Sequence, residues 1–483
     1  MVKKTDLRKI DEYLYEIPKE FRPDMRVPAR LYADEAILED ALGDRSIEQL
    51  VNTATLPGVV RYTLAMPDIH QGYGPPIGGV IATRHPDGII SPGATGYDIN
   101  CGVRVLVSNI TADELRPHLE KLVNALFQNI PSGVGKGGAI RLNTKELDEV
   151  MVRGAAFAVE RGYGSREDLE RTEERGALAG ADPAAVSRHA RERGSPQLGT
   201  LGSGNHFIEV SVVEEVYDPE VADAWGLFPG QIAVWIHSGS RGLGHQVCSD
   251  YVRDFQKAVQ KYNISLPDRE LVCAPFNSPE GQAYFGAMAS AANYAWANRQ
   301  VMAELVRRTF EQVLAGKVSD WHLRQIYDVA HNIVKIEEHD VDGKRMKLIV
   351  HRKGATRAFG PGHPVLPPAY RDTGQPVLIP GDMGTGSYLL VGTEKAMRDA
   401  FGTTCHGAGR VWSRAQAKKS IRGEELIQQL RQKGIIVRAG SMAGLAEEAP
   451  DAYKDVDRVV NVVHKAGLAR KVARFRPLGV IKG

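Results

Sequence analysis

The hydrophobic pattern divides the chain into short β-forming runs and longer stretches with helical spacing. The β-forming runs are rich in Val, Ile and Leu, and most of them lie beside a glycine-rich stretch: residues 59–64, 77–82, 206–210, 232–236, 326–334, 347–351 and 377–379. Runs of this length and composition predict buried strands. The glycine-rich neighbours predict loops at the strand ends, where side chains are free to form a site.

Helical spacing is found in stretches of the chain between these runs. It predicts helices near residues 34–50, 111–128, 145–161, 165–175 and 183–193, and a mostly helical region over 249–314 with a long helix from 280. Pro18, Pro23 and Pro28 interrupt residues 1–50 and predict an irregular N-terminal segment. Residues 165–193 are highly charged, so we expect a peripheral helical insertion with solvated faces. The pattern predicts a mixture of strands and helices but not their topology.

Composition limits the classes of function. The 483 residues carry a formal net charge of +2, so any nucleic-acid contact must come from a local basic patch. Four scattered cysteines do not form a disulfide framework, the N-terminus resembles no signal peptide, and no apolar run is long enough to span a membrane. We therefore expect a soluble cytoplasmic protein.

The stretch 96–104 carries the first candidate chemistry. Asp98 and Cys101 lie three residues apart between glycines, so a carboxylate and a thiol can face one point. A buried cysteine beside a turn aspartate is the alternative. Three histidines, His206, His237 and His331, also lie at strand ends or in apolar runs, which favours a metal site. Five such ligands suit two divalent ions that share the Cys101 thiolate.

Other histidines and cysteines leave alternatives open. His245 would replace His237 as a ligand, or Cys405 would join the set, whereas we interpret three further histidines as hydrogen-bonding or surface groups: His70, His351 and His363. The Gly-Val-Gly-Lys stretch at 133–136 lacks the spacing of a phosphate-binding loop.

His406 has a different setting from the candidate ligands. It lies in a glycine-rich stretch that we expect to open a helix continuing to about residue 420, with Arg410 and Arg414 four residues apart on one face. Arginines disfavour a further cation but suit an anion. We therefore interpret His406 as a nucleophile that attacks phosphorus and holds it as a phosphoramidate.

Several long motifs together resemble one family, the RtcB RNA-splicing ligases. They are Gly-Tyr-Asp-Ile-Asn-Cys-Gly at 96–102, Gly-Ser-Gly-Asn-His-Phe-Ile-Glu at 202–209, His-Ser-Gly-Ser-Arg-Gly-Leu-Gly-His at 237–245, Pro-Gly-Asp-Met-Gly-Thr at 380–385 and Cys-His-Gly-Ala-Gly-Arg at 405–410. The resemblance covers nearly the whole chain, from the loop at 67–74 to the terminal Lys-Gly. It implies an α+β fold: a single large compact domain, with stacked central β-sheets around a dinuclear metal site and helices outside.

The resemblance also implies an activity. The chain would be a GTP- and Mn²⁺-dependent ligase that joins RNA 3′-phosphate or 2′,3′-cyclic phosphate ends to 5′-hydroxyl ends, in tRNA splicing and RNA repair. A guanylylated histidine and an RNA(3′)pp(5′)G species would be intermediates. Its substrates would be tRNA halves or broken RNA, and its partners would include an archease-type activator but no membrane.

By motif position, the resemblance assigns roles to individual residues. His406 would be the nucleophile and Asp68 would orient it; Asp98, Cys101 and His206 would hold one Mn²⁺, and Cys101, His237 and His331 the other. The nucleotide would contact Asn205, His206, Phe207, Ile208, Glu209, His331, Asn332, Pro380, Gly381, Asp382, Met383, Ser387, His406, Gly407, Ala408, Gly409, Tyr453 and Lys482. RNA phosphates would contact Arg241, Lys353, Arg410 and Arg414.

Two other functions compete with this interpretation. Without the resemblance, a two-metal phosphohydrolase or nuclease would rank first, because paired metal ions are common in phosphoryl chemistry. A non-enzymatic RNA-binding or translation-factor role is the other class. A hydrolase needs no histidine that carries a nucleotide, and a binding protein needs no thiol at residue 101.

Overall fold

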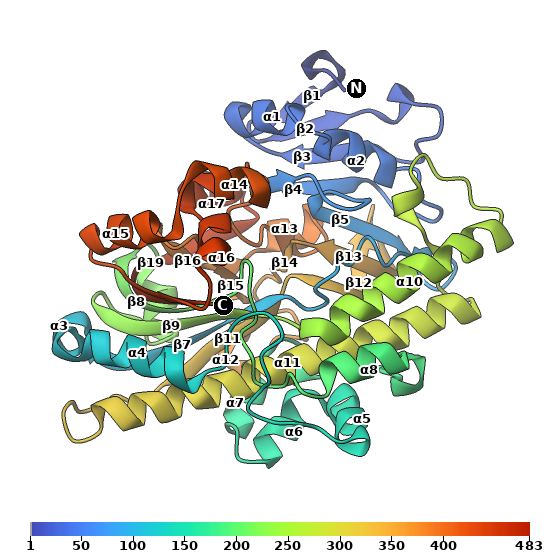
Figure 1. Cartoon of the computed structure of the whole chain (residues 1–483). Coiled ribbons are helices and arrows are strands. Elements are labelled where there is room, and N and C mark those ends of the chain that lie inside the picture. The colour runs from blue at the N-terminus through green and yellow to red at the C-terminus, as the bar shows by residue number, and fades with distance from the viewer. Residues whose placement is uncertain (1) are drawn as a thin grey trace.

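Two large mixed β-sheets form the framework of the computed structural model, which describes residues 2–483 (Figure 1). The seven-stranded sheet has the order β1 (Arg8–Asp11), β2 (Leu14–Ile17), β3 (Ala29–Tyr32), β4 (Thr63–His70), β5 (Ile77–Arg84), β13 (Lys344–Lys353) and β12 (Asn332–Val341). All its neighbouring strands are antiparallel except β3 and β4.

The eight-stranded sheet has the order β11 (Arg324–Ala330), β7 (Gly102–Thr111), β9 (Gln231–Ser238), β8 (Phe207–Val216), β19 (Ala469–Lys482), β16 (Ser387–Gly392) and β15 (Pro376–Ile379). Its eighth strand, β18 (Ile436–Ala439), pairs in parallel with β19. Two short ladders, β6 (Ile89–Ile90) with β10 (Ala274–Pro275) and β14 (Thr356–Arg357) with β17 (Thr403–Thr404), complete the strands.

The chain passes directly from one large sheet to the other at a single residue. Strand β11 ends at Ala330 in the eight-stranded sheet, and β12 begins at Asn332 in the seven-stranded sheet. His331 lies between them, so its position is fixed from both sides. The sequence pattern showed one apolar run over 326–334 and gave no sign of this change of sheet.

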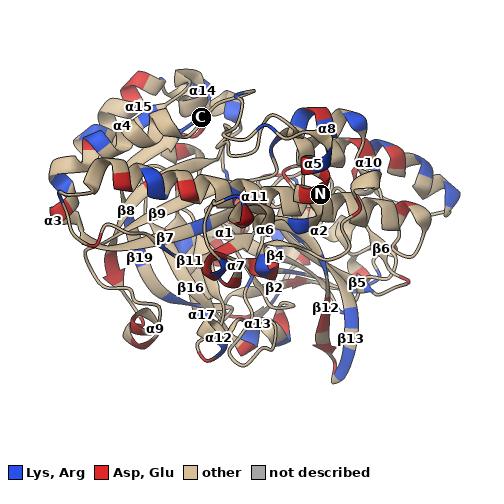
Figure 2. Cartoon of the chain, turned by 90° about the horizontal axis from the view of Figure 1, so that it is seen from below, with Lys and Arg blue, Asp and Glu red and all other residues tan. Residues whose placement is uncertain are grey.

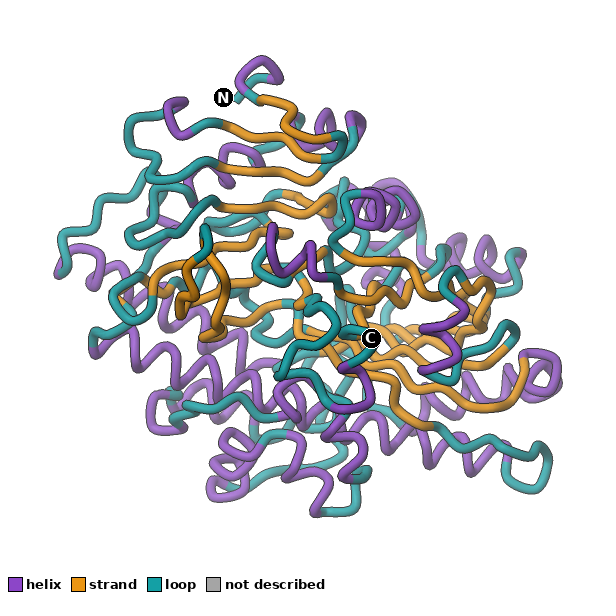
Figure 3. Tube along the Cα trace, turned by 180° about the vertical axis from the view of Figure 1, so that it is seen from behind, coloured by secondary structure: helices purple, strands orange, loops and turns teal. Residues whose placement is uncertain are grey.

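Helix α11 (Pro279–Leu314) is the central helix of the fold. It is alanine-rich and almost wholly buried from Gly281 to Ala303, as expected of a helix covered on all sides. It contacts α4 (Leu119–Asn129), α5 (Thr144–Arg153), α6 (Ala155–Glu160) and α10 (Arg241–Lys261). In Figure 3 the strands extend from the N-terminal edge at the top through the middle of the molecule, and many helices lie below and beside them.

Other helices cover the remaining sheet surfaces. Helices α1 (Glu35–Leu42), α2 (Ser46–Thr53) and α17 (Val456–Lys465) share an apolar core with β3, β4 and β5. Helix α15 (Gly423–Gln432) contributes Leu426 and Leu430 to the core of the eight-stranded sheet. The α+β class with two large sheets in one compact fold is therefore confirmed, but the expectation that helices lie outside does not hold for the buried helix α11.

The remaining helices are short. They are α3 (Ala112–Leu115), α7 (Arg166–Glu170), α8 (Arg188–Gly194), α9 (Pro219–Ala224), α12 (Pro368–Arg371), α13 (Glu394–Asp399), α14 (Arg414–Ser420) and α16 (Met442–Glu447). Among the described residues, none of the helices is both long and apolar enough to cross a membrane.

Three predictions of local structure were wrong. The N-terminal segment is not irregular, because β1, β2 and β3 pair into the edge of the seven-stranded sheet, and strand pairing is set by partners distant in sequence. No helix opens at residue 403, since α14 begins only at Arg414. Residues 165–193 are not wholly solvated: Asp168 and Glu173 are buried and pair with Arg307 and Lys335. Whether this segment is an insertion stays a prediction.

The two chain ends differ in their surroundings. The first strands lie on the outside of the molecule (Figure 1), whereas the C-terminal end follows β19 of the eight-stranded sheet and is buried. Gly483 is buried, and an added Cβ there would lie 1.6 Å from the carbonyl oxygen of Gly202. Basic and acidic residues are interspersed along the outer helix α10, in keeping with the small net charge (Figure 2).

Candidate metal centre and nucleotide cavity

The turn that carries Asp98 and Cys101 immediately precedes β7. The amide of Cys101 donates a 2.9 Å hydrogen bond to the carbonyl of Asp98, which closes the turn. Asn100 adopts a left-handed backbone (φ 51°), a conformation that asparagine tolerates, and its side chain donates to the carbonyl of Ala292 in α11. The carboxylate and the thiol are thus held by the central helix.

Strand pairing brings two histidines to the thiol. His237 is near the end of β9, where it pairs with Val103 of β7 on one side and Phe207 of β8 on the other. His206 immediately precedes β8. The Cys101 Sγ lies 3.2 Å from Nε2 of His237 and 3.6 Å from Nε2 of His206. The possible ligand atoms of these three buried residues lie within 4.8 Å of one another.

Asp98 extends this cluster. Its Oδ2 lies 2.8 Å from Nε2 of His206, and its Oδ1 accepts a 3.1 Å hydrogen bond from the amide of Ser240. Burial alone would raise the pKa of Asp98, but the His206 hydrogen bond and charge lower it to about 2. The carboxylate is therefore ionised and available to a cation at neutral pH.

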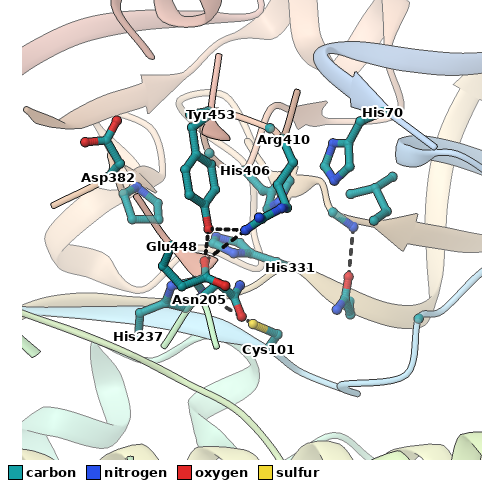
Figure 4. A pocket seen from close by; sticks show the side chains of 18 of the residues that line it. His70, Cys101, Asn205, His237, His331, Asp382, His406, Arg410, Glu448 and Tyr453 are labelled. Carbon is teal, nitrogen blue, oxygen red and sulfur yellow. Dashed lines mark hydrogen bonds and ion pairs between the residues drawn. The ribbon is translucent and has the colours of Figure 1, made fainter. Parts of the chain in front are cut away.

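His331 faces the same cluster from the junction of the two sheets (Figure 4). Its amide donates 2.7 Å to the carbonyl of Cys101, and its ring centre lies 6.0 Å from that of His237 and 5.3 Å from that of His406. Burial, followed by the charge of His406, lowers the pKa of His331 well below its usual value. The ring is neutral, the form in which histidine binds metals.

The chemistry of these donors fits divalent cations. Among the described residues, the His331 ring nitrogens and Nδ1 of His237 are buried without a hydrogen-bond partner. Unpaired buried polar atoms are costly, and a cation beside them would remove that cost. Thiolate, imidazole and carboxylate together suit ions such as Zn²⁺, Mn²⁺ or Fe²⁺. The cluster is a candidate metal centre, and the sharing of the Cys101 thiolate between two ions stays a prediction.

A second pair, His406 and Asp68, lies on the other side of His331. Asp68 is buried at the end of β4, and its Oδ2 accepts hydrogen bonds from the amides of His406 (3.0 Å) and Gly407 (3.3 Å) and contacts Nδ1 of His406. Burial raises the pKa of Asp68, but the charge and hydrogen bonds of His406 outweigh this effect and lower it. With Nδ1 bound to the carboxylate, Nε2 of His406 is the ring nitrogen left without this contact, and its role as a nucleophile stays a prediction.

The loop after β17, rather than a helix N-terminus, gives His406 its position. Gly409 has φ +82°, and a Cβ there would approach the carbonyl oxygen of Asp68 to 2.4 Å. The glycines of this loop therefore allow it to pack against β4. The sequence of this loop suggested the start of a helix. The residue that shapes the loop, Asp68, is more than 300 residues away in the chain, so no local signal showed the true structure.

A cavity of about 320 Å³ joins the metal cluster to His406. The predicted site residues that line it are Cys101, Asn205, Phe207, His237, His331, Asn332, Lys353, Pro380, Gly381, Asp382, Met383, His406, Gly407, Ala408, Gly409, Arg410, Arg414, Tyr453 and Lys482. Asp98, His206 and Arg241 line an adjoining cavity of about 580 Å³, and Asn205 and Arg414 line both.

Three further predicted nucleotide contacts lie behind the cavity wall. Ser387 accepts a 2.9 Å hydrogen bond from the amide of Gly381, so it supports the loop that forms one wall. Glu209 is buried, and burial together with nearby Asp382 raises its pKa well above the usual value. Ile208 lies in the apolar core shared with α4. Ser387 and Ile208 thus contact other parts of the protein, and their contact with a ligand stays a prediction.

Lys482 projects into the cavity from the last strand. Its Nζ donates 2.8 Å to the carbonyl of Gly204, and burial lowers its pKa to about 8. Lys482 is buried because β19, which carries it, runs through the middle of the eight-stranded sheet.

The predicted RNA-binding cations already have protein partners. Arg410 donates to Glu448 (3.1 Å) and to the Tyr453 hydroxyl (3.1 Å), and Arg414 pairs with Glu447 (3.3 Å). Glu448 was missed from the sequence; it is buried, lines the cavity and approaches Tyr453 (Figure 4). The sequence shows Glu448 only as an acidic residue shortly before Tyr453, which does not distinguish it from other acidic residues.

Two further cations lie deeper than expected. Lys353 is buried and donates to the carbonyls of Tyr73 and Pro75, and burial lowers its pKa to about 7. Arg241 donates 2.9 Å to Nδ1 of His206, next to the metal cluster. Both line cavities, but their contact with RNA stays a prediction.

The alternatives to the ligand set lie away from the cluster or lack its geometry. His245 is on α10, where its ring packs against Tyr97, and Cys405 is fully buried outside both cavities' linings. His351 and His363 accept or share backbone hydrogen bonds. His70 does so too, with Asp68, but it also lines the nucleotide cavity, which the sequence did not indicate.

Comparisons with known proteins agree with this site. A family model described as tRNA-splicing ligase RtcB matches residues 49–483. Proteins named tRNA-splicing ligase RtcB from Thermococcus kodakarensis and Archaeoglobus fulgidus are 58% and 57% identical to this chain over 477 residues, which is 99% of each sequence. One from Methanococcus maripaludis is 51% identical over 480 residues, covering 99% of this chain and 100% of the relative. The matched region contains every residue that lines the two cavities.

Proposed function

The chain belongs to the tRNA-splicing ligase RtcB family, and from this membership we propose that it is an RNA ligase that uses GTP and Mn²⁺. It would join RNA 3′-phosphate or 2′,3′-cyclic phosphate ends to 5′-hydroxyl ends. The observation that carries the proposal is the pairing of His406 with buried Asp68. The ring centre of His406 lies 5.3 Å from that of His331, and His406 lines the same cavity as Cys101.

His406 is the nucleophile of the first step. Its Nε2 attacks the α-phosphorus of GTP, the bond to the β-phosphate breaks, and pyrophosphate leaves. Asp68 holds the Nδ1 proton and balances the positive charge that develops on the ring. The product is GMP bound to His406 through a phosphorus–nitrogen bond.

In the second step GMP is transferred from His406 to RNA, and in the third step the two RNA ends are joined. A 3′-phosphate oxygen of one RNA attacks the GMP phosphorus and releases His406. The 5′-hydroxyl of the other RNA then attacks the former 3′-phosphate, forms the phosphodiester and releases GMP. A 2′,3′-cyclic phosphate is first hydrolysed to the 3′-phosphate.

The donor set supports a pair of cations beside these reactions. Asp98, Cys101 and His206 would hold one ion, and Cys101, His237 and His331 the other. Bound there, divalent ions polarise phosphate oxygens and stabilise the attacking and leaving groups.

The cavity walls support nucleotide and RNA recognition. Tyr453 and Lys482 line the cavity and would present an aromatic ring and a cation to guanine, and Glu209, buried behind the wall, would contact the base as the family resemblance implies. Arg241, Arg410, Arg414 and Lys353 are the cations for phosphates. tRNA halves or broken RNA would be the substrates, and an archease-type protein would promote turnover, in the cytoplasm.

Ligation can be distinguished from hydrolysis with one labelled substrate. RNA carrying a ³²P-labelled 3′-phosphate is incubated with the protein, GTP, Mn²⁺ and a second RNA with a 5′-hydroxyl. We expect the label at the new junction, resistant to phosphatase, and no junction with His406→Ala. Release of the label as inorganic phosphate, independent of GTP, would instead identify a two-metal phosphohydrolase.

A further inference from the structure

Arg299 lies on the central helix α11 directly beneath the candidate metal centre. Its side chain is fully buried. Nη1 donates to the carbonyl of Asn100 (2.7 Å) and to the carbonyl of Ser238 (2.9 Å), and Nη2 donates to Oδ1 of Asn100 (2.9 Å). Asn100 immediately precedes Cys101 and Ser238 immediately follows His237, so one guanidinium contacts both ligand-bearing segments.

The neighbouring backbone is shaped around this guanidinium. A Cβ at Gly102 would lie 2.8 Å from Cζ of Arg299 and 2.2 Å from the carbonyl oxygen of Val329. The residue after Cys101 therefore has no side chain, which leaves room for Arg299 to reach past the turn. This close packing limits the positions that the Cys101 backbone can adopt.

A buried carboxylate balances the charge of Arg299. Asp328 accepts from Nε (2.9 Å) and Nη2 (2.9 Å) of Arg299, and its Oδ2 also accepts from Nε of Arg104 (2.8 Å). Arg104 is equally buried, but the other hydrogen bond of its side chain goes to Gln300, and the side chain donates none to Asn100 or Ser238. The two arginines thus share Asp328 as counterion, but only the side chain of Arg299 donates hydrogen bonds to Asn100 and Ser238, the neighbours of Cys101 and His237.

The preceding residue of α11, Asn298, repeats the arrangement on the His206 side. The side chain of Asn298 accepts from the amides of Gly199 (2.8 Å) and Thr200 (3.1 Å) and donates to the carbonyl of Thr200 (3.0 Å) and to Oγ of Ser238 (3.2 Å). Consecutive residues of one rigid helix therefore fix the loop before His206, the end of β9 and the Cys101 turn.

We propose that Arg299 is a positioning residue of the metal centre, which sets the distance between the Cys101 thiol and the His237 imidazole through the backbone of Asn100 and Ser238. The inference rests on the proposed metal-dependent function. The planar guanidinium supplies five donors in a fixed geometry, and here it donates to five acceptor atoms of three residues, Asn100, Ser238 and Asp328. A lysine ammonium at the same position has three donors on a flexible stem and cannot span both segments.

The test compares Mn²⁺ affinity with stability in matched variants. Mn²⁺ binding to the purified full chain is titrated by the electron paramagnetic resonance signal of the free ion, and the melting temperature is measured without metal. Arg299→Lys is compared with Arg104→Lys, which loses the same buried counterion contact but no contact with the ligand segments. We expect both variants to melt at lower temperature, and only Arg299→Lys to bind Mn²⁺ about 10- to 100-fold more weakly.

A second variant keeps the test decisive if Arg299→Lys does not fold. Asn100→Gly keeps the left-handed backbone at that position and removes the Oδ1 acceptor, so it should also weaken Mn²⁺ binding while leaving Asp328 paired. Parent-like Mn²⁺ affinity in the folded variants, or an equal loss in Arg104→Lys, would overturn the inference. A parent protein that binds no Mn²⁺ would instead refute the proposed function.

Discussion

Asp68→Asn isolates the charge of the residue that holds the proposed nucleophile. In the parent, one carboxylate oxygen accepts hydrogen bonds from the amides of His406 and Gly407 and from Nδ1 of His406. The other oxygen is buried without a partner among the described residues. Asparagine has nearly the same shape, so its carbonyl oxygen can retain all three bonds while the charge is lost.

The expected magnitude follows from these three bonds. Hydrogen bonds to a charged group contribute about 1.5–3 kcal/mol and neutral ones about 0.5–1.5 kcal/mol, so each bond loses about 1 kcal/mol. If the loss is felt mainly when charge develops on the ring, about 3 kcal/mol corresponds to a roughly 100-fold slower formation of the GMP–enzyme. Because the pKa of Asp68 is already below its usual value, the effect should be nearly constant above pH 5.

The assay is single-turnover labelling of the protein with [α-³²P]GTP and Mn²⁺ in the absence of RNA. Omitting RNA separates this step from ligation, and the melting temperature of the variant shows whether the loop around His406 has kept its structure. A matched control is Asp87→Asn, an exposed carboxylate whose contacts are confined to Arg84 and to solvent. A labelling rate within threefold of the parent in a well-folded Asp68→Asn would refute the role assigned to this carboxylate.

Three further predictions concern the metal, the buried lysine and the chain end. Burial and Asp98 raise the pKa of the Cys101 thiol, so Mn²⁺ must displace its proton; affinity should rise about tenfold per pH unit, and Cys101→Ser should abolish this dependence in a binding titration. The pKa of Lys482, about 8, is below its value in the unfolded state. Between pH 8 and 10.5 the unfolded state therefore binds more protons, and the free energy of unfolding should increase with pH. In denaturant unfolding, Lys482→Met should lack up to about 1.4 kcal/mol per pH unit of that gain. Gly483→Ala should lower both the melting temperature and GTP affinity, because its Cβ would lie 1.6 Å from the carbonyl oxygen of Gly202; unchanged values of both would contradict this.

The candidate ligands could be predicted from the sequence because strand ends and glycine loops are local signals. The runs around His206 and His237 end in loops, and β7, β8 and β9 are neighbours in one sheet, so their ends meet at Cys101. The pattern could not show that His331 lies between two different sheets. That fact depends on strand pairing between distant segments, which no local pattern records.

The missed features share the same physical origin. The strands β1 to β3 have weak local patterns and form only because β4 offers an edge for pairing. The loop around His406 is shaped by Asp68, which is 338 residues away in the chain. Arg299 lies within a long helix and Glu448 within an acidic segment. A single charged residue in either place is common and gives no sequence signal of its role. Their significance comes from the partners that the fold brings to them.

The account depends most directly on whether the His406 imidazole carries GMP. After incubation of the parent protein with GTP and Mn²⁺ under alkaline quench, which preserves a phosphorus–nitrogen bond, peptide mass spectrometry should locate one GMP on His406. The modification should be absent from His406→Ala and from Cys101→Ser. An unmodified His406, or GMP on another residue with equal labelling of His406→Ala, would contradict the proposed chemistry.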